Sequence, residues 1–355
     1  MKALKHTLGA LAVGTCLTAA APAFAQAEFT LVVPLATGED NYNYKAMQAF
    51  SQHVETKSGG RIDVEIYPGG TLCASGRECF EGMQAGLVDI YQSNFGEPSN
   101  LWGAFAGLDL PYMLRDDQVA ECVFDDQEFM AFLRDGMLEQ TGNVRLMVVS
   151  NSGGWRNFAT TEKPILAPED VEGMKLRTIP AEIQQELVRQ LGGAPTGISW
   201  PEVYTSLATG VVEGTKNGIT DIVVMNFHEH LKHITLDGHA YMGGTWFVNN
   251  DKFASMPQDL QVIMAEGFDI IEQYLRAYPK YAEVAAYDAF VEAGGTIHAL
   301  TNEQKAAFRE ATSGMEDWFT AQGDENQAFL DTFKGVIDEC VASVDSHLQA
   351  QTQTQ

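Results

Sequence analysis

The stretch from Glu172 to Asn217, EGMKLRTIPAEIQQELVRQLGGAPTGISWPEVYTSLATGVVEGTKN, contains the pattern that decides the fold. An apolar run that ends at Arg177 predicts a short strand, and an amphipathic helix follows it. Ser199 and Glu202 have the spacing of a capping box for a second helix, and a second strand ends near Asn217. This order of strand, helix, helix and strand predicts an α/β unit, whose loops at the strand ends are common ligand sites.

The same stretch resembles the solute-binding proteins of TRAP (tripartite ATP-independent periplasmic) transporters, of the dicarboxylate-receptor-like family. The resemblance covers roughly residues 29–300. It rests on LRTIP, on APTGISWPEVYTSLATGVVEG, on KSGGRIDVEIYPGGTL (57–72), on LDLPYM (108–113) and on GWRNFATTEKPILAPEDVEGMKLR (154–177). It implies a periplasmic-binding-protein fold of two lobes, each with a mixed sheet flanked by helices, and a long helix that spans both lobes.

The first 25 residues have the features of a cleavable signal peptide. Lys2 and Lys5 give a positive start, an apolar stretch follows, and Ala23-Phe24-Ala25 is a typical cleavage site. We therefore expect an exported, periplasmic chain that begins near Gln26. Cys16 follows Thr15 rather than a small residue, which argues against a lipid anchor.

The expected mature chain is strongly acidic. Without Lys2 and Lys5 it has 20 basic and 48 acidic residues, a net charge of −28. Such a surface repels phosphate backbones and anionic lipid headgroups, so we expect no nucleic-acid partner and no peripheral membrane binding. The charge does not identify a partner, and a saline habitat would also screen it.

Four cysteines remain after the leader: Cys73, Cys79, Cys122 and Cys340. An even number in an exported protein favours two disulfides, although four cysteines allow three connectivities. We expect Cys73 to pair with Cys79 across a short turn and, by elimination, Cys122 to pair with Cys340. The alternative is free or metal-binding thiols, which the lack of a CxxC pair disfavours.

The periodicity of the chain predicts how it divides into lobes. The segments 29–35, 61–68 and 87–92 read as strands separated by helices, which predicts parallel pairing. Residues 143–149 read as another strand, which Asn151-Ser152-Gly153-Gly154 would break at a hinge. We expect lobe I in 26–152 plus about 243–280, and lobe II with the C-terminal helices in 153–242 plus about 281–345.

The C-terminal third is helical in pattern. Residues 257–293 carry apolar side chains at helical spacing, and Pro279 should kink or break that helix. Residues 234–236 and 245–249 look like two short returning strands. Two further helices are expected at 302–322 and 325–349, and we expect residues 346–355 to form a disordered polar tail.

Arg177 is the principal candidate for ligand binding. A guanidinium group holds a carboxylate through two parallel charge-assisted hydrogen bonds. Periodicity alone would favour a surface ion pair for this arginine. The resemblance instead implies that Arg177 binds the carboxylate of the ligand, that Arg156 adds a hydrogen bond, and that Asn217 is a further contact.

Three more residues are candidates for the ligand site. Trp200 starts a helix, where an indole can stack on a ligand, and an ordinary packing residue is the alternative. Asn94 occupies a position where the resemblance implies a polar contact, often an acid, and a turn asparagine is the alternative. Tyr42, in the loop after the first strand, is the weakest candidate. Lys216 and Gly218 depart from the residues common in the family, so the substrate does not transfer from it.

No motif for covalent or metal chemistry is present in the sequence. The run HEHLKH (228–233) lacks the second histidine of HExxH, because Lys232 occupies its place. The sequence contains no GxSxG, no Walker A motif and no GxGxxG after a strand. We therefore expect a protein without catalytic residues, cofactor or metal ligands, although the resemblance leaves open a metal ion that bridges the ligand carboxylate.

These observations predict a monomeric periplasmic receptor that captures a small organic acid. The resemblance implies delivery of this acid to the small and large integral membrane subunits of a TRAP transporter. One alternative is a sensing module that passes the ligand to a signalling receptor. Another is a periplasmic enzyme that acts on organic acids. The identity of the acid remains open.

Overall fold

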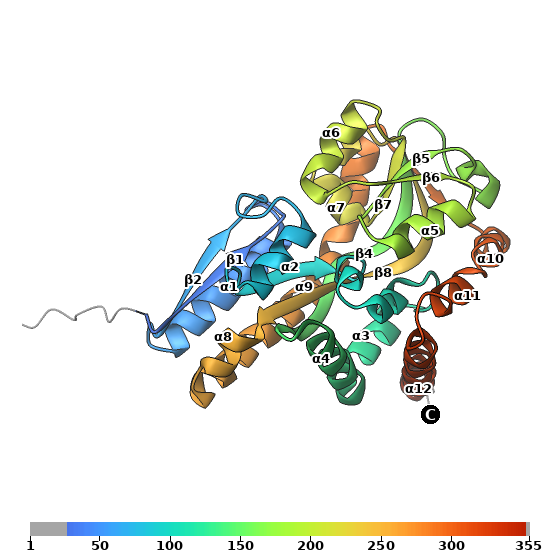
Figure 1. Cartoon of the computed structure of the whole chain (residues 1–355). Coiled ribbons are helices and arrows are strands. Elements are labelled where there is room, and N and C mark those ends of the chain that lie inside the picture. The colour runs from blue at the N-terminus through green and yellow to red at the C-terminus, as the bar shows by residue number, and fades with distance from the viewer. Residues whose placement is uncertain (1–26, 353–355) are drawn as a thin grey trace, which may run out of the picture.

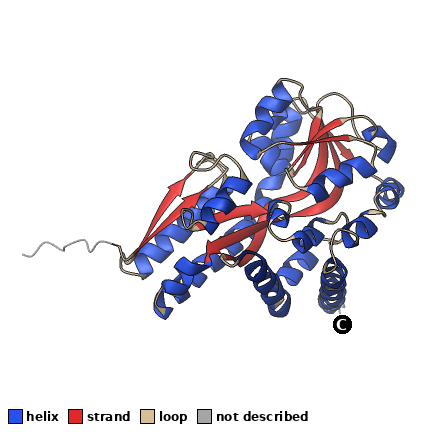
Figure 2. Ribbon diagram, in the orientation of Figure 1, coloured by secondary structure: helices blue, strands red, loops and turns tan. Residues whose placement is uncertain are grey.

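Two long strands organise the computed structural model, which describes residues 27–352 (Figure 1). These strands are β4 (Val144–Thr160) and β8 (His233–Asn249), each of 17 residues. They pair antiparallel from Val144 opposite Asn249 to Thr160 opposite His233. At about 3.3 Å per residue each strand extends over about 55 Å. They therefore connect the region around β1 and β2 with the region around β5 to β7 (Figure 2).

The larger sheet contains seven strands within residues 27–352, in the order β3-β8-β4-β7-β5-β6 with β9 beside β8. Strand β3 is antiparallel to β8, and β7 is antiparallel to β4. Strand β5 is parallel to both of its neighbours, β6 and β7, and β9 is parallel to β8. The mixed α/β fold predicted from the sequence is thus confirmed. The short strands are β3 (Ile90–Asn94), β5 (Lys175–Thr178), β6 (Ala194–Gly197), β7 (Gly214–Asn217) and β9 (Thr296–Ala299).

The smaller sheet pairs β1 (Phe29–Pro34) with β2 (Ile62–Tyr67) in parallel, and α1 (Tyr42–Lys57) connects them. This confirms the parallel pairing predicted for the first two strands. The prediction was wrong for β3, which follows α2 (Gly76–Gln84) and pairs antiparallel with β8 in the larger sheet. A hydrogen bond from the Asp89 amide to the Val32 carbonyl keeps the start of β3 beside β1.

The expected break at Asn151–Gly154 is absent, because β4 continues through these residues. The register with β8 shifts between Asn151 and Trp155, which is a bulge inside one strand. Gly153 and Gly154 adopt φ values of 118° and 87°, a region that favours glycine. The Asn151 Oδ1 atom accepts hydrogen bonds from both glycine amides and holds the bulge. Likewise, the two short strands expected at 234–236 and 245–249 are the ends of β8.

The helix α9 (Gln258–Glu292) is continuous over 35 residues, about 52 Å. It packs against α1, β4 and α7 (Ile219–Val224), so it contacts both ends of the molecule. The predicted break at Pro279 does not occur. Proline removes one backbone hydrogen bond, but Leu275 and Pro279 are both buried on the packed face of α9, where tertiary contacts maintain the helix.

The remaining helices surround the sheets. Ser199 and Glu202 do not form the predicted capping box, because the Ser199 side chain makes no capping bond and a 3-10 turn precedes α6. Residues 302–322 form two helices instead of one. The other helices are α3 (Asp117–Asp125), α4 (Gln127–Thr141), α5 (Glu182–Gln190), α6 (Val203–Ala208), α8 (Asn250–Ser255), α10 (Asn302–Ala311), α11 (Met315–Thr320) and α12 (Asn326–Thr352).

Both ends of the chain bear on predictions from the sequence. The helix α12 continues to Thr352, so residues 346–352 are helical where a disordered tail was predicted. The predicted signal peptide, residues 1–25, lies outside the described residues. No helix within residues 27–352 is long and apolar enough to cross a bilayer.

Two disulfides confirm the expected cysteine pairing. One links Cys73 to Cys79 beside the start of α2, and the other links Cys122 of α3 to Cys340 of α12. The second bond joins residues 218 positions apart in the sequence. It fastens the C-terminal helix to the helical layer formed by α3 and α4.

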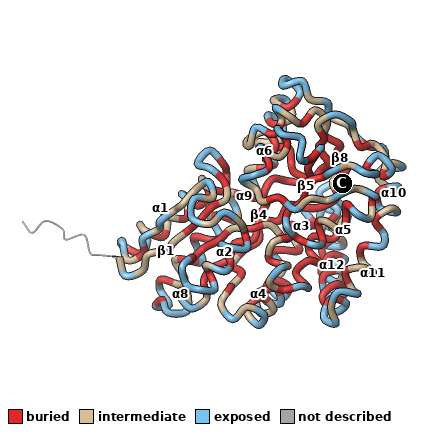
Figure 3. Tube along the Cα trace, turned by 45° about the horizontal axis from the view of Figure 1, so that its top comes forward, coloured by how far each residue is buried: buried red, intermediate tan, exposed pale blue. Residues whose placement is uncertain are grey.

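Buried residues fill the interior of the molecule (Figure 3), and the hydrophobic ones form three clusters. One cluster packs α3, α4 and α12 around Phe124, Leu133 and Phe333. A second packs β1, α1 and α9 around Phe50 and Phe268. A third lies around Phe227 and Phe290, between α7 and the C-terminal half of α9. The ends of β3, β5 and β7 remain lined by polar residues, and the candidate site is there.

Candidate functional site

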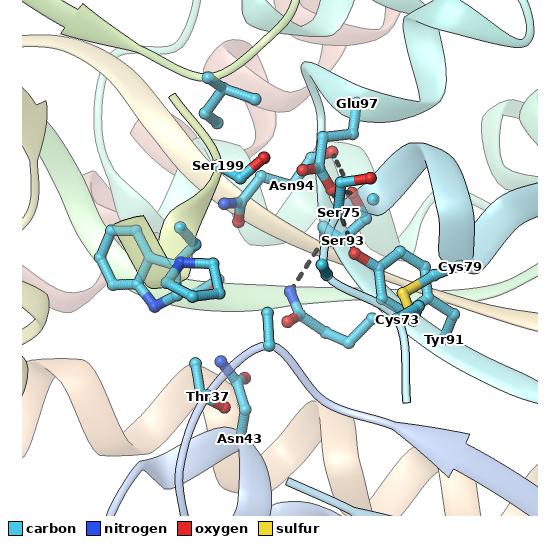
Figure 4. A pocket seen from close by; sticks show the side chains of 18 of the residues that line it. Thr37, Asn43, Cys73, Ser75, Cys79, Tyr91, Ser93, Asn94, Glu97 and Ser199 are labelled. Atoms are coloured by element: carbon cyan, nitrogen blue, oxygen red, sulfur yellow. Dashed lines mark hydrogen bonds between the residues drawn. A yellow bond between two sulfur atoms is a disulfide. The ribbon is translucent and has the colours of Figure 1, made fainter. Parts of the chain in front are cut away.

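A cavity lies where the ends of β3, β5 and β7 meet the loop after β1 (Figure 4). Its walls come from sequence segments that are far apart, so the tertiary fold assembles it. The lining residues are Ala36, Thr37, Asn43, Cys73, Ala74, Ser75, Gly76, Cys79, Tyr91, Gln92, Ser93, Asn94, Glu97, Ser152, Arg177, Ile179, Ser199, Trp200, Pro201, Asn217 and Asp221. Most of these side chains are polar, which indicates a polar ligand.

Arg177 provides a guanidinium group to the cavity from β5. Its side chain is buried, its Nε donates to the Ile198 carbonyl at 3.0 Å, and its guanidinium carbon lies 5.6 Å from the Trp200 ring centroid. Burial, and then the charge of Arg156, lower the pKa of Arg177 to about 9. The guanidinium therefore remains charged at neutral pH, and an anion would stabilise it. Its single hydrogen bond within the described residues uses Nε, so both terminal nitrogens can hold a carboxylate.

Arg156 lies in β4 and does not line the cavity. It is 2 % exposed, and its Nη1 donates to the Lys216 carbonyl at 3.0 Å. Its buried Nε has no hydrogen-bond partner in the described part of the chain. Lys216 is also buried, and its Nζ donates to the Gln184 carbonyl at 3.1 Å. Arg156 therefore acts on the site through its charge rather than by forming its wall, and Lys216 also lies outside the wall.

Asn217, Trp200 and Asn94 line the cavity together with Arg177. The Thr215 hydroxyl donates to the Asn217 Oδ1 at 2.8 Å, which orients the amide. The Trp200 Nε1 and the Asn94 Oδ1 are buried atoms without a hydrogen-bond partner among the described residues. Two polar groups with unused hydrogen-bonding capacity thus border the same space. The ligand-binding roles of these residues stay predictions.

Tyr42 begins α1 and is fully buried behind the cavity wall. Its hydroxyl donates a short hydrogen bond to the Asp221 carboxylate. Burial, and then the Asp221 charge, raise the pKa of the Tyr42 phenol, so the phenol stays protonated and keeps donating. Tyr42 therefore supports a lining residue and is not itself part of the lining.

Glu97 and Asp221 are the functional candidates that the sequence analysis missed. Both line the cavity. Burial raises the pKa of Asp221 to about 6 despite the Tyr42 hydrogen bond, and burial also raises the pKa of Glu97. Asp221 was detectable as a lone acid in the apolar run GITDIVV, one helical turn after Asn217. Glu97 had no such signal, because it lies in an irregular segment.

Within residues 27–352, no group of three or more His, Cys, Asp or Glu side chains has an arrangement suited to a metal ion. His230 and His233 of the HEHLKH run lie apart from the cavity lining. The cavity itself offers one cation, two carboxylates and several neutral hydrogen-bonding groups. Such a lining can bind and orient a small polar molecule that bears a carboxylate.

Comparison with known proteins agrees with this architecture. Residues 35–321 match the model of the bacterial extracellular solute-binding protein, family 7. The C4-dicarboxylate-binding periplasmic protein of Rhodobacter capsulatus is 28 % identical over 320 residues, which are 88 % of this chain and 93 % of that protein.

Solved structures show the same fold. A TRAP periplasmic solute-binding protein of Anaerococcus prevotii with bound glucuronate has a TM-score of 0.82 at 22 % identity, covering 88 % of this chain and 99 % of that one. Another, from Sulfurospirillum deleyianum with bound succinate, has a TM-score of 0.80 at 23 % identity, covering 88 % and 100 %. The family match spans most of the chain, so the protein belongs to the bacterial extracellular solute-binding protein family 7.

Proposed function

We propose that the protein is the periplasmic solute receptor of a TRAP transporter and binds a small organic acid in this cavity. The observation that carries the proposal is the buried Arg177, which lines the cavity and whose single hydrogen bond within the described residues uses Nε rather than a terminal nitrogen. Burying such a charge is costly unless an anion is provided. The ligand carboxylate provides it, and Asn217, Trp200 and Asn94 contact the rest of the molecule.

Lobe closure follows from the placement of the cavity. Its lining combines residues near β1 and α1, which we assign to lobe I, with residues of β5 and β7, which we assign to lobe II. The strands β4 and β8 pass between the two regions, and the bulge at Gly153-Gly154 is the hinge at which they bend. The ligand contacts both lobes and therefore favours the closed form of the protein. The integral membrane subunits recognise this closed form.

The test is a thermal-shift titration of purified, ligand-free protein with small carboxylates, comparing the parent with Arg177→Ala. A ligand at 100 times its dissociation constant stabilises the native state by about 2.7 kcal/mol. We expect at least one carboxylate to raise the melting temperature of the parent and to have no effect on Arg177→Ala. Arg189→Ala is the matched control, because Arg189 is an arginine of the neighbouring helix α5 that lies outside the cavity. Equal shifts in the parent and Arg177→Ala would refute the proposed role of Arg177.

A further inference from the structure

The lining of the cavity contains more carboxylates than cations, although Arg156 and Lys216 are buried behind it. Its charged residues are one arginine, Arg177, and two carboxylates, Glu97 and Asp221. The two acids come from different elements: Glu97 begins the 3-10 turn after β3, and Asp221 lies in α7. Figure 4 shows Glu97 near Ser93 and Ser75, on the side of the cavity opposite Thr37 and Asn43.

Neither carboxylate neutralises Arg177 directly. The single hydrogen bond of Arg177 within the described residues goes to the Ile198 carbonyl, and no ion pair joins it to Glu97 or Asp221 within 4 Å. The two acids are near enough to affect its pKa, however. Positive and negative groups therefore face the same space without touching. A ligand of matching charges can fill that space.

The lining also contains acceptor atoms that lack donors. The Glu97 Oε2 accepts from Ser93 at 2.7 Å and from Tyr91 at 3.3 Å, whereas its other oxygen takes no hydrogen bond in the described structure. The side-chain oxygens of Thr37, Asn43 and Asn94 are buried and have no partner among the described residues. Thr37 and Asn43 are only 7 % and 2 % exposed. Unpaired buried acceptors are costly, so the ligand should bring several N–H or O–H donors.

Charge favours a protonated nitrogen over a second carboxylate at the far end of the ligand. A dicarboxylate that bound Arg177 with one end would bring its other negative end close to Glu97 or Asp221 in a buried space. Two like charges that lie close together repel strongly when little water is present. A protonated nitrogen has the opposite effect, because an ammonium group donates three hydrogen bonds and pairs with carboxylates.

We infer that the ligand is a small zwitterion, an acid that also carries an ammonium or amidinium group. Its carboxylate binds Arg177, and its positive nitrogen lies between Glu97 and Asp221, within reach of the Asn43 and Asn94 amides. This inference rests on the proposed function, since it assumes that Arg177 holds a carboxylate. It adds the second charge of the ligand, which neither the fold nor the family specifies.

The test uses probes of similar size that differ at one end. Calorimetric titration of the full mature chain would compare 4-aminobutanoate, succinate and butanoate, together with alanine, β-alanine, the cyclic amidinium acid ectoine, and glucuronate as a hydroxyl-rich acid. We expect an amino or amidinium acid to bind at least about tenfold more tightly than succinate, because a charged hydrogen-bonded pair typically contributes a factor of about ten or more. Binding of succinate or glucuronate as tight as the best zwitterion would overturn the inference.

Two single variants separate charge recognition from a structural role. Glu97→Gln and Asp221→Asn should each weaken zwitterion binding about tenfold or more and should strengthen succinate binding, because each removes one negative charge from the lining. A variant that merely damages the fold would weaken the binding of both the zwitterion and succinate. The control is Glu202→Gln, which removes an exposed carboxylate outside the lining and should change neither affinity.

The outcomes also distinguish this inference from the proposed function. If a dicarboxylate or sugar acid binds best and Arg177→Ala abolishes that binding, the receptor function stands and the zwitterion inference fails. If Arg177→Ala binds the best probe as well as the parent does, or if no probe binds the parent, the carboxylate site itself is wrong. Melting temperatures of the ligand-free variants, within a few degrees of the parent, would show that each variant is folded.

Discussion

Lys216 is a buried cation within a group of charged residues behind the cavity. Burial, and then the charge of Arg156, lower its pKa from 10.5 to about 7. Asp109 and Asp237 oppose this shift, but the residual effect still favours the neutral amine. The unfolded chain therefore binds more protons than the folded chain between about pH 7 and pH 10. The contribution of Lys216 to stability therefore rises with pH across that interval.

The substitution Lys216→Met tests this effect. We expect the free energy of unfolding of the parent to increase by about 2 kcal/mol more than that of Lys216→Met between pH 7 and pH 9, because methionine has no charge to bury. Urea denaturation at the two pH values measures the difference. Lys175→Met is the control, because Lys175 is exposed on β5 and should leave the pH dependence unchanged. A parallel pH dependence in the parent and Lys216→Met would contradict the expectation.

At the scale of single residues, the sequence indicated one cation and three neutral residues of the lining but neither of its acids, and the predicted Arg156 and Tyr42 lie outside the lining. Arg177, Asn217, Trp200 and Asn94 were expected at the site, and the structure places all four in the cavity lining. Glu97 and Asp221 were missed. An acid in a sequence is usually solvated, and only the surrounding fold reveals that it is enclosed opposite an arginine.

The bulge in β4 lies within one of the two strands that join the two ends of the molecule. It lies halfway along the strand, and its backbone approaches the cavity wall through Asp221. A β-carbon added to Gly153 would lie 2.8 Å from the Asp221 Oδ2 and 3.1 Å from the Tyr42 hydroxyl. A β-carbon on Gly154 would have no neighbour within 4 Å. The two adjacent glycines thus differ mainly in the space around them.

This contrast gives a prediction for the bulge. Gly153→Ala should lower the free energy of unfolding by about 2 to 3 kcal/mol, because strain from its φ of 118° adds to the close contact with Asp221. Gly154→Ala carries only the conformational strain and should cost about 1 kcal/mol. Urea denaturation of both variants measures the difference. Equal losses would mean that the contact with Asp221 is relieved by small movements of the carboxylate.

At the scale of elements, periodicity identified most helices and strands but not their continuity. The expected interruptions at Gly153-Gly154 and Pro279 rest on local preferences of glycine and proline. In the structure, pairing with β8 and packing of α9 against α1 and β4 override them. Local preferences describe which backbone conformation a residue favours on its own. A neighbouring strand or helix adds contacts with residues that are distant in the sequence, and these contacts can outweigh the local preference.

The two disulfides act on very different lengths of chain. Cys122–Cys340 closes a loop of more than two hundred residues, whereas Cys73–Cys79 closes one of only a few. In the chain-entropy model a longer loop restricts the unfolded state more, and the difference between these two loops is about 3 kcal/mol. The long-range bond therefore stabilises the whole molecule. The short one lies in the cavity lining.

Serine double variants of each pair should separate these effects. We expect Cys122→Ser with Cys340→Ser to lower the free energy of unfolding more than Cys73→Ser with Cys79→Ser, by about 3 kcal/mol, and to leave ligand affinity nearly unchanged. The Cys73 and Cys79 pair of substitutions should weaken ligand binding, because both residues line the cavity. Denaturation and calorimetry on the same samples provide both readouts. The reverse ranking of the stabilities would argue against the loop-length explanation.

The sequence by itself determined the alternation of strands and helices and favoured two disulfides for its four cysteines. Both features depend on short spacings and on the chemistry of individual side chains, whereas the choice of Arg177 as the carboxylate-binding residue depended on motifs shared with a family. Tertiary structure alone decided that β4 and β8 run unbroken, that β3 joins the larger sheet, and that Glu97 and Asp221 face Arg177 across one cavity. The physical reason is that strand partners and cavity walls come from segments that are far apart in the chain. Their proximity depends on which surfaces bury each other, and no local pattern records that.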